Sequence, residues 1–197
     1  MKLIIASNNA HKIREIKQIL GSRFEEILSL REAKIDHETV EDGTTFLENA
    51  RKKATEIAEI SGCCALADDS GICAHALNNE PGVYSARYAG GHGDDEANNQ
   101  LLIKNLRDKD DRTAHYACAI VLAYPDGSIL SAEGEMHGEV IDNPRGENGF
   151  GYDPIFFLPE YGMTSAEISP EEKNRISHRA KALNALVEKL DRDERDN

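Results

Sequence analysis

Two hydrophobic periodicities run along this chain and predict a mixture of strands and helices. Short apolar runs predict strands over residues 2–6, 24–28, 63–67 and 116–124. Residues 130–140 alternate between apolar and polar side chains, as a half-buried antiparallel strand does. Apolar residues three and four positions apart predict helices that end near Leu20, Ser61 and Leu106, and a last helix over residues 170–190.

The stretch from Leu66 to Gly71 is the first candidate for chemistry, because an apolar run delivers Asp68 and Asp69 side by side. Adjacent side chains on a strand point to opposite faces, so the two carboxylates are expected to have different roles. We expect the strand to end at this pair, with Gly71 allowing a sharp bend after it. Such carboxylates suit a Mg²⁺ ion or a general base that activates water. An ordinary Asp-Asp-Ser-Gly turn is the alternative interpretation.

Two further polar stretches lie next to predicted helix starts. The loop from Ser7 to Lys12 joins a strand to a helix, so backbone N–H groups and the Lys12 ammonium would favour a phosphate there. A plain asparagine-capped helix is the alternative. Thr45 and Glu48 form a capping box, which gives Glu48 a structural role. Glu41 has no such role and is the better candidate for a metal ligand.

A glycine-rich loop near residue 150 brings two aromatic residues and an acid together. The segment Phe150-Gly151-Tyr152-Asp153 suits nucleobase recognition, because an aromatic face stacks on any base and a carboxylate can read a base edge. A hydrophobic strand entry is the alternative. Lys173, His178 and Arg179 lie near predicted helix N-termini, where cations are unfavourable. An anionic or hydrogen-bonding ligand would explain their presence.

Length and residue types restrict the class of protein. A chain of 197 residues suggests one domain, which could have two lobes. The four cysteines form no C-x-x-C pair, so we interpret them as reduced residues, mostly of the core. His115 and His137 lack the acid–histidine spacing of metal sites and are interpreted as surface or cross-strand residues. Without a signal peptide or an apolar stretch near the roughly 20 residues of a membrane span, a soluble cytoplasmic protein is expected.

The charge of the chain bears on its partners. Asp and Glu number 36 against 23 Lys and Arg, which gives a formal net charge of −13. Duplex DNA and membrane surfaces call for a basic face, so neither is an expected partner. A small anionic ligand is compatible with this charge, since a few local cations, backbone N–H groups and a metal can hold it.

Six short segments then occur in a fixed order along the chain. They are Ser7-x-Asn9-x-x-Lys12, Thr45-Phe46-x-Glu48-Asn49-Ala50, Ala67-Asp68-Asp69-Ser70-Gly71, Pro81-Gly82-Val83-Tyr84-Ser85-Ala86-Arg87-Tyr88, Phe150-Gly151-Tyr152-Asp153-Pro154 and Ser177-His178-Arg179. In this order and at these intervals they resemble the inosine/xanthosine triphosphate pyrophosphatase family, which removes deaminated purine nucleotides from the nucleotide pool. The resemblance covers about residues 2–190. Asn8 and His11 depart from it, since many members have glycine at either position, and this bears only on the shape of the phosphate loop.

The resemblance implies Mg²⁺-dependent hydrolysis of ITP, dITP and XTP between the α- and β-phosphates, giving a monophosphate and pyrophosphate. It implies that Asp69 is the general base and a metal ligand, and that Glu41 is the second metal carboxylate. In it, the loop at residues 7–12 cradles the triphosphate and Phe150 stacks on the purine. The residues implied to bind substrate are Ser7, Asn8, Asn9, Ala10, His11, Lys12, Ser70, Phe150, Gly151, Tyr152, Asp153, Lys173, His178 and Arg179.

The resemblance also implies a fold. It is an elongated α/β protein with two lobes around a mixed, twisted β-sheet with flanking helices, and with the active site in the cleft between the lobes. Residues 1–190 would form this one domain, and residues 191–197 a charged, frayed tail. A homodimer is implied, whereas nucleic acid and membrane partners are not.

Substrate preference would come from the 6-oxo group of deaminated purines. Donors such as Arg179 and loop N–H groups can satisfy that acceptor, whereas the amino group of adenine would face them with another donor. Three other interpretations remain: a related pyrophosphatase for modified pyrimidines or dTTP, a non-catalytic nucleotide sensor, and a phosphatase with an aspartyl-phosphate intermediate. The Phe150–Asp153 loop and the Ser-His-Arg segment argue against the first, and the acid pair against the second. The third would require a D-x-D pattern at the end of the first strand, whereas this chain has Ser-Asn-Asn there.

Overall fold

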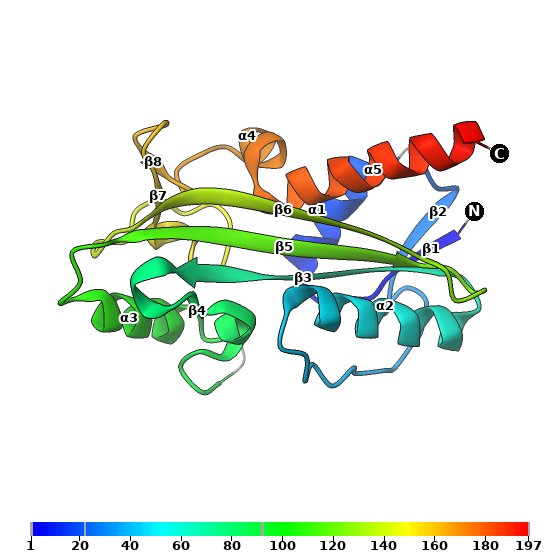
Figure 1. The fold of residues 1–197 in the computed structure, drawn as a ribbon, viewed down its shortest axis with the longest axis horizontal. Helices are drawn as coiled ribbons and strands as arrows, with labels where there is room; N and C mark the ends of the chain where they lie inside the picture. Colours follow the sequence, from blue (N-terminus) through cyan, green and yellow to red (C-terminus); the bar gives the residue numbers. More distant parts are fainter. Residues whose placement is uncertain (1, 22, 92, 197) are drawn as a thin grey trace. The chain divides into compact units, whose positions relative to one another are not determined.

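The computed structural model describes residues 2–21, 23–91 and 93–196, with side chains up to residue 192, and it shows an α/β protein (Figure 1). The strands are β1 (Lys2–Ile5), β2 (Glu26–Ser29), β3 (Cys64–Ala74), β4 (Glu80–Pro81), β5 (Thr113–Ala123), β6 (Ile129–Val140), β7 (Phe156–Leu158) and β8 (Met163–Thr164). The α-helices are α1 (Ala10–Leu20), α2 (Phe46–Ser61), α3 (Asp95–Leu106), α4 (Pro170–Ile176) and α5 (His178–Asp196). Short 3-10 helices are η1 (His75–Leu77), η2 (Gly82–Arg87) and η3 (Asp153–Ile155).

Within the described residues the strands form one eight-stranded sheet, in the order β2-β1-β3-β5-β6-β7-β8, with β4 beside β3. The sheet is mixed, because β1 runs parallel to β2 and β3, whereas β4, β7 and β8 pair antiparallel with their neighbours. The predicted α/β fold with a mixed sheet and flanking helices is therefore confirmed.

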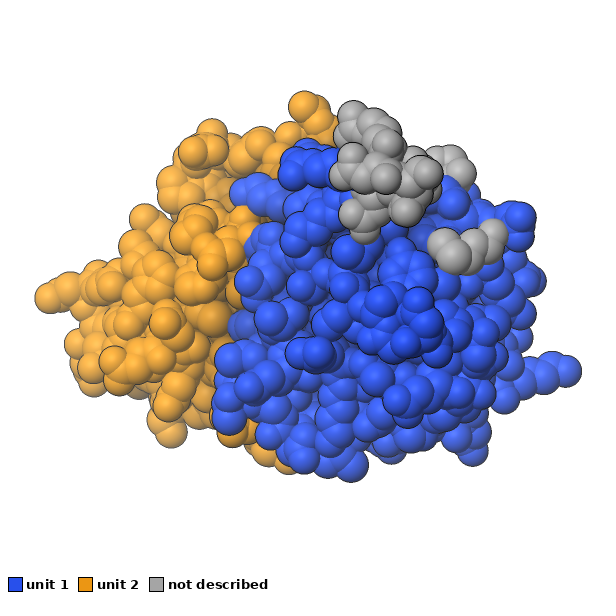
Figure 2. Space-filling model, turned by 45° about the vertical axis from the view of Figure 1, so that its right-hand side comes forward, with its two compact units in different colours: residues 1–69, 118–134, 179–197 blue, residues 70–117, 135–178 orange. Residues whose placement is uncertain are grey.

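The chain divides into two compact units, which Figure 2 shows in different colours. Unit 1 contains residues 1–69, 118–134 and 179–197, and unit 2 contains residues 70–117 and 135–178. Strands β3, β5 and β6 contribute residues to both units. The units are described separately below.

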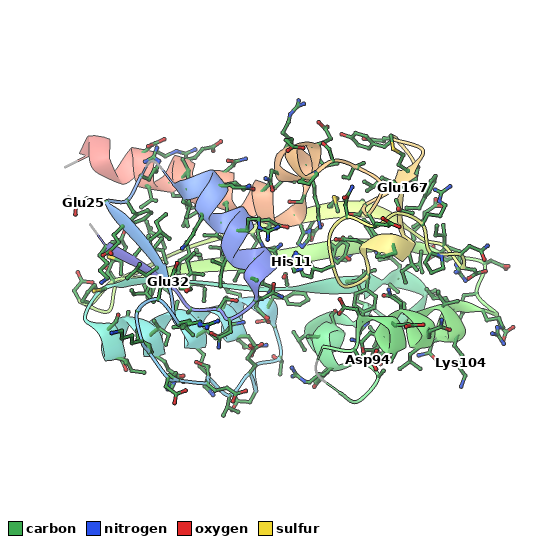
Figure 3. All side chains as sticks on the ribbon, turned by 180° about the vertical axis from the view of Figure 1, so that it is seen from behind. His11, Glu25, Glu32, Asp94, Lys104 and Glu167 are labelled. Carbon is green, nitrogen blue, oxygen red and sulfur yellow. The ribbon has the colours of Figure 1, made fainter. Side chains whose placement is uncertain are left out.

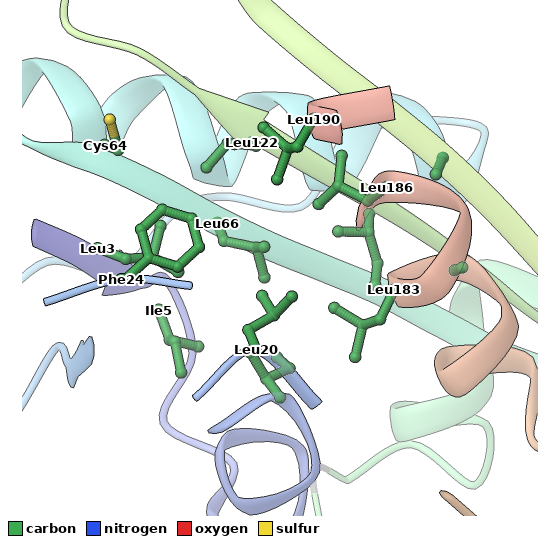
Figure 4. Close-up of a cluster of buried hydrophobic side chains, with 14 of the residues drawn as sticks. Leu3, Ile5, Leu20, Phe24, Cys64, Leu66, Leu122, Leu183, Leu186 and Leu190 are labelled. Carbon is green, nitrogen blue, oxygen red and sulfur yellow. The ribbon is translucent and has the colours of Figure 1, made fainter. Parts of the chain in front are cut away.

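The core of unit 1 follows the alternation of side chains along β1 and β3. Leu3, Ile5 and Leu66 face one side, where they pack with residues of α1 and α5 (Figure 4). The residues between them face the other side, where Ile4 and Ala65 pack with α2. The strands of unit 1 thus have helices on both faces, as Figure 1 shows for α2 on one side and α1 and α5 on the other.

The helices of unit 1 begin where the sequence predicts. Asn9 caps α1 by accepting hydrogen bonds from the backbone of His11 and Lys12. Thr45 and Glu48 form the predicted capping box of α2, each accepting from the other's backbone at 3.1 Å. Gly62 ends α2 with a φ of 63°, a conformation that favours glycine.

Strand β3 corrects one prediction, because it does not end at the acid pair. It continues from Cys64 to Ala74 with Asp68 and Asp69 in its middle, and Gly71 makes no bend. Gly71 instead allows η2 to approach the strand closely within unit 2. A Cβ atom there would collide with the Ser85 hydroxyl and the carbonyl of Gly82. The Ser85 hydroxyl accepts from Ile72 N at 3.0 Å and donates to Gly82 O at 2.6 Å, which fastens η2 to the strand.

The last helix, predicted over residues 170–190, is present as two helices. Ser169 caps α4, with Pro170 in the first turn, and the chain breaks at Ser177 before α5 begins. Helix α5 continues through the charged residues 191–196, and Asn197 lies outside the described residues; that this tail frays stays a prediction. This stretch has no glycine or proline, and acids and bases four apart, such as Glu188 and Arg192 at 3.7 Å, support a helix.

Candidate active site

The predicted site residues form two clusters, one in each unit. Unit 1 holds residues 7–12, Glu41, Asp69 and Arg179, whereas unit 2 holds Ser70, residues 150–153, Lys173 and His178. The prediction that both belong to one cleft stays a prediction. Each cluster has a defined internal geometry.

Asp68 lies on the face of β3 that packs against α1 and α5, because it shares the parity of Leu66. Its carboxylate is 2% exposed and forms ion pairs with Lys12 and with Arg179, whose Nε donates at 2.9 Å. The Cys118 thiol also donates to it at 3.0 Å. Burial opposes the charged form, but Arg179 and Lys12 outweigh burial and hold the pKa of Asp68 well below its usual value of 3.8. Asp68 is thus ionised at neutral pH, and its ion pairs connect β3 to α1 and α5 within unit 1.

Arg179 is the cation that holds Asp68. It is 1% exposed, and its Nη1 donates to Glu15 Oε2 at 2.5 Å. The guanidinium therefore bridges a carboxylate of β3 and one of α1. The family resemblance implies that Arg179 lies near the base and phosphates of a substrate, and this stays a prediction. In the structure its guanidinium contacts the carboxylates of Asp68 and Glu15. Glu15 was missed, although it lies three residues after Lys12 on the same face of α1.

Asp69 lies on the opposite face of β3, toward α2. Asn49 Nδ2 donates to its Oδ2 at 3.0 Å, and Lys53 Nζ lies 3.3 Å from its Oδ1. Burial and the nearby Glu41 raise the pKa of Asp69 above its usual value of 3.8, although Lys53, Lys12 and Asn49 oppose the rise. The prediction that the two side chains point to opposite faces of the strand is therefore confirmed, whereas their different roles stay a prediction. Asp68 is locked into ion pairs, whereas Asp69 is a buried carboxylate of increased basicity.

Lys53 is a member of this cluster that the sequence reasoning missed. Its ammonium contacts Glu41 Oε1 at 3.1 Å and the backbone carbonyl of Asp68 at 3.0 Å, in addition to Asp69. Burial disfavours its charge, but Asp69 and Glu41 outweigh burial and raise the pKa of Lys53. The available signal was its spacing, since it follows Asn49 by four residues on α2 and so shares its face.

Glu41 comes from the loop before α2, which is fastened to that helix at several points. His37 Nε2 and Thr39 Oγ1 each lie 2.7 Å from Glu56 Oε2. Asp42 pairs with Lys52 at 2.8 Å. These contacts hold the loop along α2 and bring Glu41 to Lys53.

The two predicted metal carboxylates meet a first structural requirement for a shared cation. Glu41 and Asp69 both contact one ammonium group, that of Lys53, so their oxygens can reach a single positive charge. Carboxylate oxygens with added water are the ligands that Mg²⁺ prefers. Across the described part of the chain, no group of three or more His, Cys, Asp or Glu side chains is arranged to enclose a metal. A metal here would therefore depend on these two carboxylates and water.

The segment from Ser7 to Lys12 contains the loop before α1 and the first turn of that helix, where Figure 3 labels His11. Asn9 Oδ1 accepts from the backbone of His11 at 3.0 Å and of Lys12 at 3.2 Å, and Asn9 N donates to Ser7 Oγ at 3.1 Å. The loop thus adopts the asparagine-capped form that the sequence left open as the alternative. Residues 8–11 are exposed, so their remaining groups can meet a ligand from solvent.

In unit 2, the loop at residues 149–153 folds around a buried ion pair. Lys173 Nζ lies 2.5 Å from Asp153 Oδ2, and the two residues are 5% and 2% exposed. The same carboxylate oxygen accepts from Phe150 N at 2.9 Å, and the ammonium lies 5.1 Å from the centre of the Phe150 ring. Phe150, Asp153 and Lys173 are therefore brought together as predicted.

The other predicted residues of unit 2 differ in their surroundings. Tyr152 is buried, and its hydroxyl donates to Ser85 O at 2.7 Å, so its side chain supports the loop from within. His178 is buried and stacks on Tyr116, with ring centres 4.6 Å apart and planes at 7°. Gly151 N donates to Asp95 in the first turn of α3, the helix capped by Asp94 (Figure 3). Ser70 is half-buried on β3, directly after the acid pair.

Comparison with known proteins identifies the family and agrees with the fold. The Ham1 family model matches residues 3–189, so the chain belongs to the Ham1 family. A dITP/XTP pyrophosphatase of Leuconostoc mesenteroides is 52% identical over 195 residues, which cover 96% of each chain. One of Clostridium perfringens is 49% identical over 198 residues, covering 96% of this chain and 97% of that protein.

A solved structure shows the same fold. The Ham1 protein of Staphylococcus aureus is similar with a TM-score of 0.88 at 41% identity, over 98% of this chain and 100% of that one. Among the helices that the structure describes, none combines the length and the apolar character needed to cross a membrane.

Proposed function

We propose that this protein hydrolyses the deaminated purine nucleoside triphosphates dITP, XTP and ITP to a monophosphate and pyrophosphate. Near full-length relatives carry the name dITP/XTP pyrophosphatase, which supports this substrate class. The observation that carries the proposal is the environment of Asp69. A buried carboxylate of raised pKa lies beside Lys53 and Glu41, as hydrolysis of a charged phosphoanhydride requires.

Asp69 is the proposed general base. It would accept a proton from a water whose oxygen attacks the α-phosphorus, while the bond from that phosphorus to the bridging oxygen breaks and pyrophosphate leaves. A carboxylate of raised pKa is the stronger base, which favours proton transfer near neutral pH. Asn49, which donates to Asp69 Oδ2 at 3.0 Å, would fix the carboxylate's orientation. Lys53 would contribute positive charge beside it.

Glu41 and Asp69 would hold the Mg²⁺ ion, whose charge would offset that of the triphosphate. Such hydrolysis relies mainly on positioning and on neutralised charge, with little covalent chemistry by the protein. Lys12 and the exposed loop at residues 7–12 would receive phosphate oxygens. Because Lys12 is paired with Asp68, phosphate binding would compete with that ion pair or extend it.

The cluster in unit 2 would receive the purine. Phe150 offers an aromatic ring for stacking, and the Asp153–Lys173 pair beneath it offers a fixed acceptor and donor for base edges. The earlier hypothesis that Arg179 reads the 6-oxo group stays a prediction. Its contacts with Asp68 and Glu15 make a simple Arg179→Ala test ambiguous, because the loss of a buried partner would also disturb the fold.

The test is pyrophosphate release from dITP, XTP, ITP, GTP, ATP and dTTP, with Mg²⁺ and with EDTA. We expect rapid, metal-dependent release from the first three and a loss of about 10²–10⁴ in rate for Asp69→Asn, as is typical for a general base. The matched control is Asp126→Asn, an isosteric change in the exposed β5–β6 turn, where the Asp126 carboxylate accepts hydrogen bonds from Ser128 of the same turn.

Other results would contradict the proposal in distinguishable ways. Release of single phosphates would exclude a pyrophosphatase, and preference for dTTP would move the activity to pyrimidines. Tight binding of ITP without turnover would indicate a nucleotide sensor. Full activity of Asp69→Asn would remove the proposed base while leaving the substrate class intact.

A further inference from the structure

Three histidines meet on neighbouring segments of unit 2, away from the residues discussed above. His75 begins η1 directly after β3, His115 lies on β5 and His137 lies on β6, and these three strands are adjacent in the sheet. The ring centres of His75 and His115 are 5.2 Å apart, and those of His115 and His137 are 5.5 Å apart. From the sequence, His115 and His137 are interpreted as surface or cross-strand residues, because they lack the acid–histidine spacing of metal sites.

Hydrogen bonds around His75 determine which of its nitrogens carries the proton. The Thr113 hydroxyl donates to Asp111 Oδ1 at 2.6 Å, so its oxygen is left to accept. It lies 2.7 Å from His75 Nδ1, which is therefore the protonated nitrogen of a neutral ring. The lone pair of His75 Nε2 then points at His115 Nδ1, 2.9 Å away.

In their present rotamers these three histidines do not enclose an ion, as holds for every such group in the described part of the chain. We propose that, after a rearrangement of the side chains, His75 Nε2 and His115 Nδ1 chelate a divalent transition-metal ion such as Zn²⁺, with His137 as the third ligand. Zinc–nitrogen bonds of about 2.0–2.1 Å in a tetrahedron place two ligand nitrogens roughly 3.3 Å apart. At the observed 2.9 Å the two nitrogens face each other in a hydrogen bond, so both rings must turn and separate by about 0.4 Å for their lone pairs to converge on an ion. On binding, the His115 proton moves from Nδ1 to Nε2, and both rings stay neutral.

The surroundings of the pair favour this role. A metal-binding histidine usually donates its other N–H to an acceptor that fixes the ring, and the Thr113–Asp111 relay does this for His75. Burial, together with the neighbouring His75 and His137, lowers the pKa of His115 against the opposing effect of Glu135, which favours the neutral form that binds metals.

His137 is positioned to complete the set by a side-chain movement. Its side chain is 66% exposed, and Nε2 lies 3.0 Å from Glu135 Oε2, whose side chain is 55% exposed. Rotation of His137 toward His115, with Glu135 still bound to it, would give a third imidazole ligand and leave the fourth position to water. Imidazole ligands select Zn²⁺, Cu²⁺ or Ni²⁺ over Mg²⁺, so this site differs in kind from the carboxylates of unit 1.

The inference is tested by calorimetric titration of Zn²⁺, and separately Ni²⁺, into metal-stripped, untagged protein with Mg²⁺ present at saturation. We expect one equivalent of Zn²⁺ to bind, and the affinity to fall at least tenfold in His75→Gln and in His115→Gln. The matched control is His37→Gln, which removes a histidine whose Nε2 pairs with Glu56, and it should bind Zn²⁺ like the wild type. Asp69→Asn should also bind it unchanged, which separates this site from the proposed active site.

Proton–nitrogen spectra of the histidine rings give a second readout that does not depend on activity. Zn²⁺ should shift the ring signals of His75, His115 and His137 and leave those of His37 in place. Absence of saturable binding, or equal affinities of His115→Gln and His37→Gln, would overturn the proposal.

Discussion

Asp68 and Asp69 are neighbours in the chain, yet their carboxylates contact cations from different helices on opposite faces of β3. Lys12 of α1 and Arg179 of α5 pair with Asp68, whereas Lys53 of α2 pairs with Asp69. The alternation of side chains along a strand produces this separation. Replacing each aspartate by the isosteric asparagine should therefore change the free energy of unfolding differently at the two positions.

Asp68→Asn should destabilise the protein, and Asp69→Asn should not. Removing the Asp68 charge leaves the buried Arg179 with Glu15 as its remaining carboxylate and takes the carboxylate away from Lys12, and breaking a buried ion pair in this way typically costs about 3–5 kcal/mol of unfolding free energy. The raised pKa of Asp69 means that folding disfavours its charged form, so neutralising it should leave stability unchanged or slightly higher. Urea unfolding of both variants at pH 7 in EDTA measures the difference. Equal losses of stability would contradict the inference that the ion pairs of Asp68 stabilise unit 1.

The stability difference between wild type and Asp68→Asn should depend on pH. Because the folded-state pKa of Asp68 lies well below 3.8, its contribution is fully present above that value and is lost as the pH falls further, toward the folded-state pKa. For Asp69 the sign is reversed, since a raised folded-state pKa makes the wild type lose stability relative to Asp69→Asn as the pH rises above 3.8. Urea unfolding at pH 3, 5 and 7 in EDTA checks both signs. If the stability difference between wild type and Asp68→Asn did not change with pH, the sign expected for Asp68 would be refuted.

The features of unit 1 that the sequence predicted are those set by local rules. The capping box of Thr45 and Glu48, the Asn9 cap and the opposite orientations of Asp68 and Asp69 depend only on residues a few positions apart. Even so, the turn-forming composition of Asp-Asp-Ser-Gly suggested that β3 ends there. Tertiary packing overrides this tendency, because Ser85 binds the backbone beside Gly71 and keeps the chain extended.

The contacts that the sequence did not predict join residues that lie far apart in the chain. Arg179 reaches Asp68 across 111 positions, and His75 reaches His115 across 40. No spacing in a single sequence encodes such contacts. Lys53 was missed for another reason, because a lysine on a helix such as α2 is usually solvated. The fold shows that Lys53 is buried beside two carboxylates.

Lys53→Met should shift the pH dependence of hydrolysis. The Lys53 ammonium lowers the pKa of Asp69, so its removal should raise that pKa further and move the acidic limb of the kcat/KM profile to higher pH. Activity at neutral pH should fall as well. Lys2→Met is the control, because Lys2 begins β1 and pairs at 3.4 Å with the exposed Glu26, outside this cluster. Profiles measured with dITP at fixed Mg²⁺ should separate the two variants, and identical profiles would exclude Lys53 as a modulator of the base.

Two glycines in the loop of unit 2 allow a paired test of its packing. Gly149 and Gly151 both have a positive φ, of 79° and 64°, so alanine at either position should cost about 1–2 kcal/mol in backbone strain. Only at Gly149 would the added methyl group collide with the Asp153 carboxylate and press on Lys173, whereas at Gly151 it meets no atom. Overpacking of this kind adds about 1–3 kcal/mol.

Gly149→Ala should therefore be less stable than Gly151→Ala, and it should also raise the KM for dITP. The reason is that Phe150 is positioned by the hydrogen bond from its backbone N–H to the same Asp153 oxygen, which the methyl group would displace. Thermal or urea unfolding gives the stability difference, and initial rates of pyrophosphate release give KM. If both variants lost stability equally and kept the wild-type KM, the Phe150–Asp153 contact would have no part in binding the substrate.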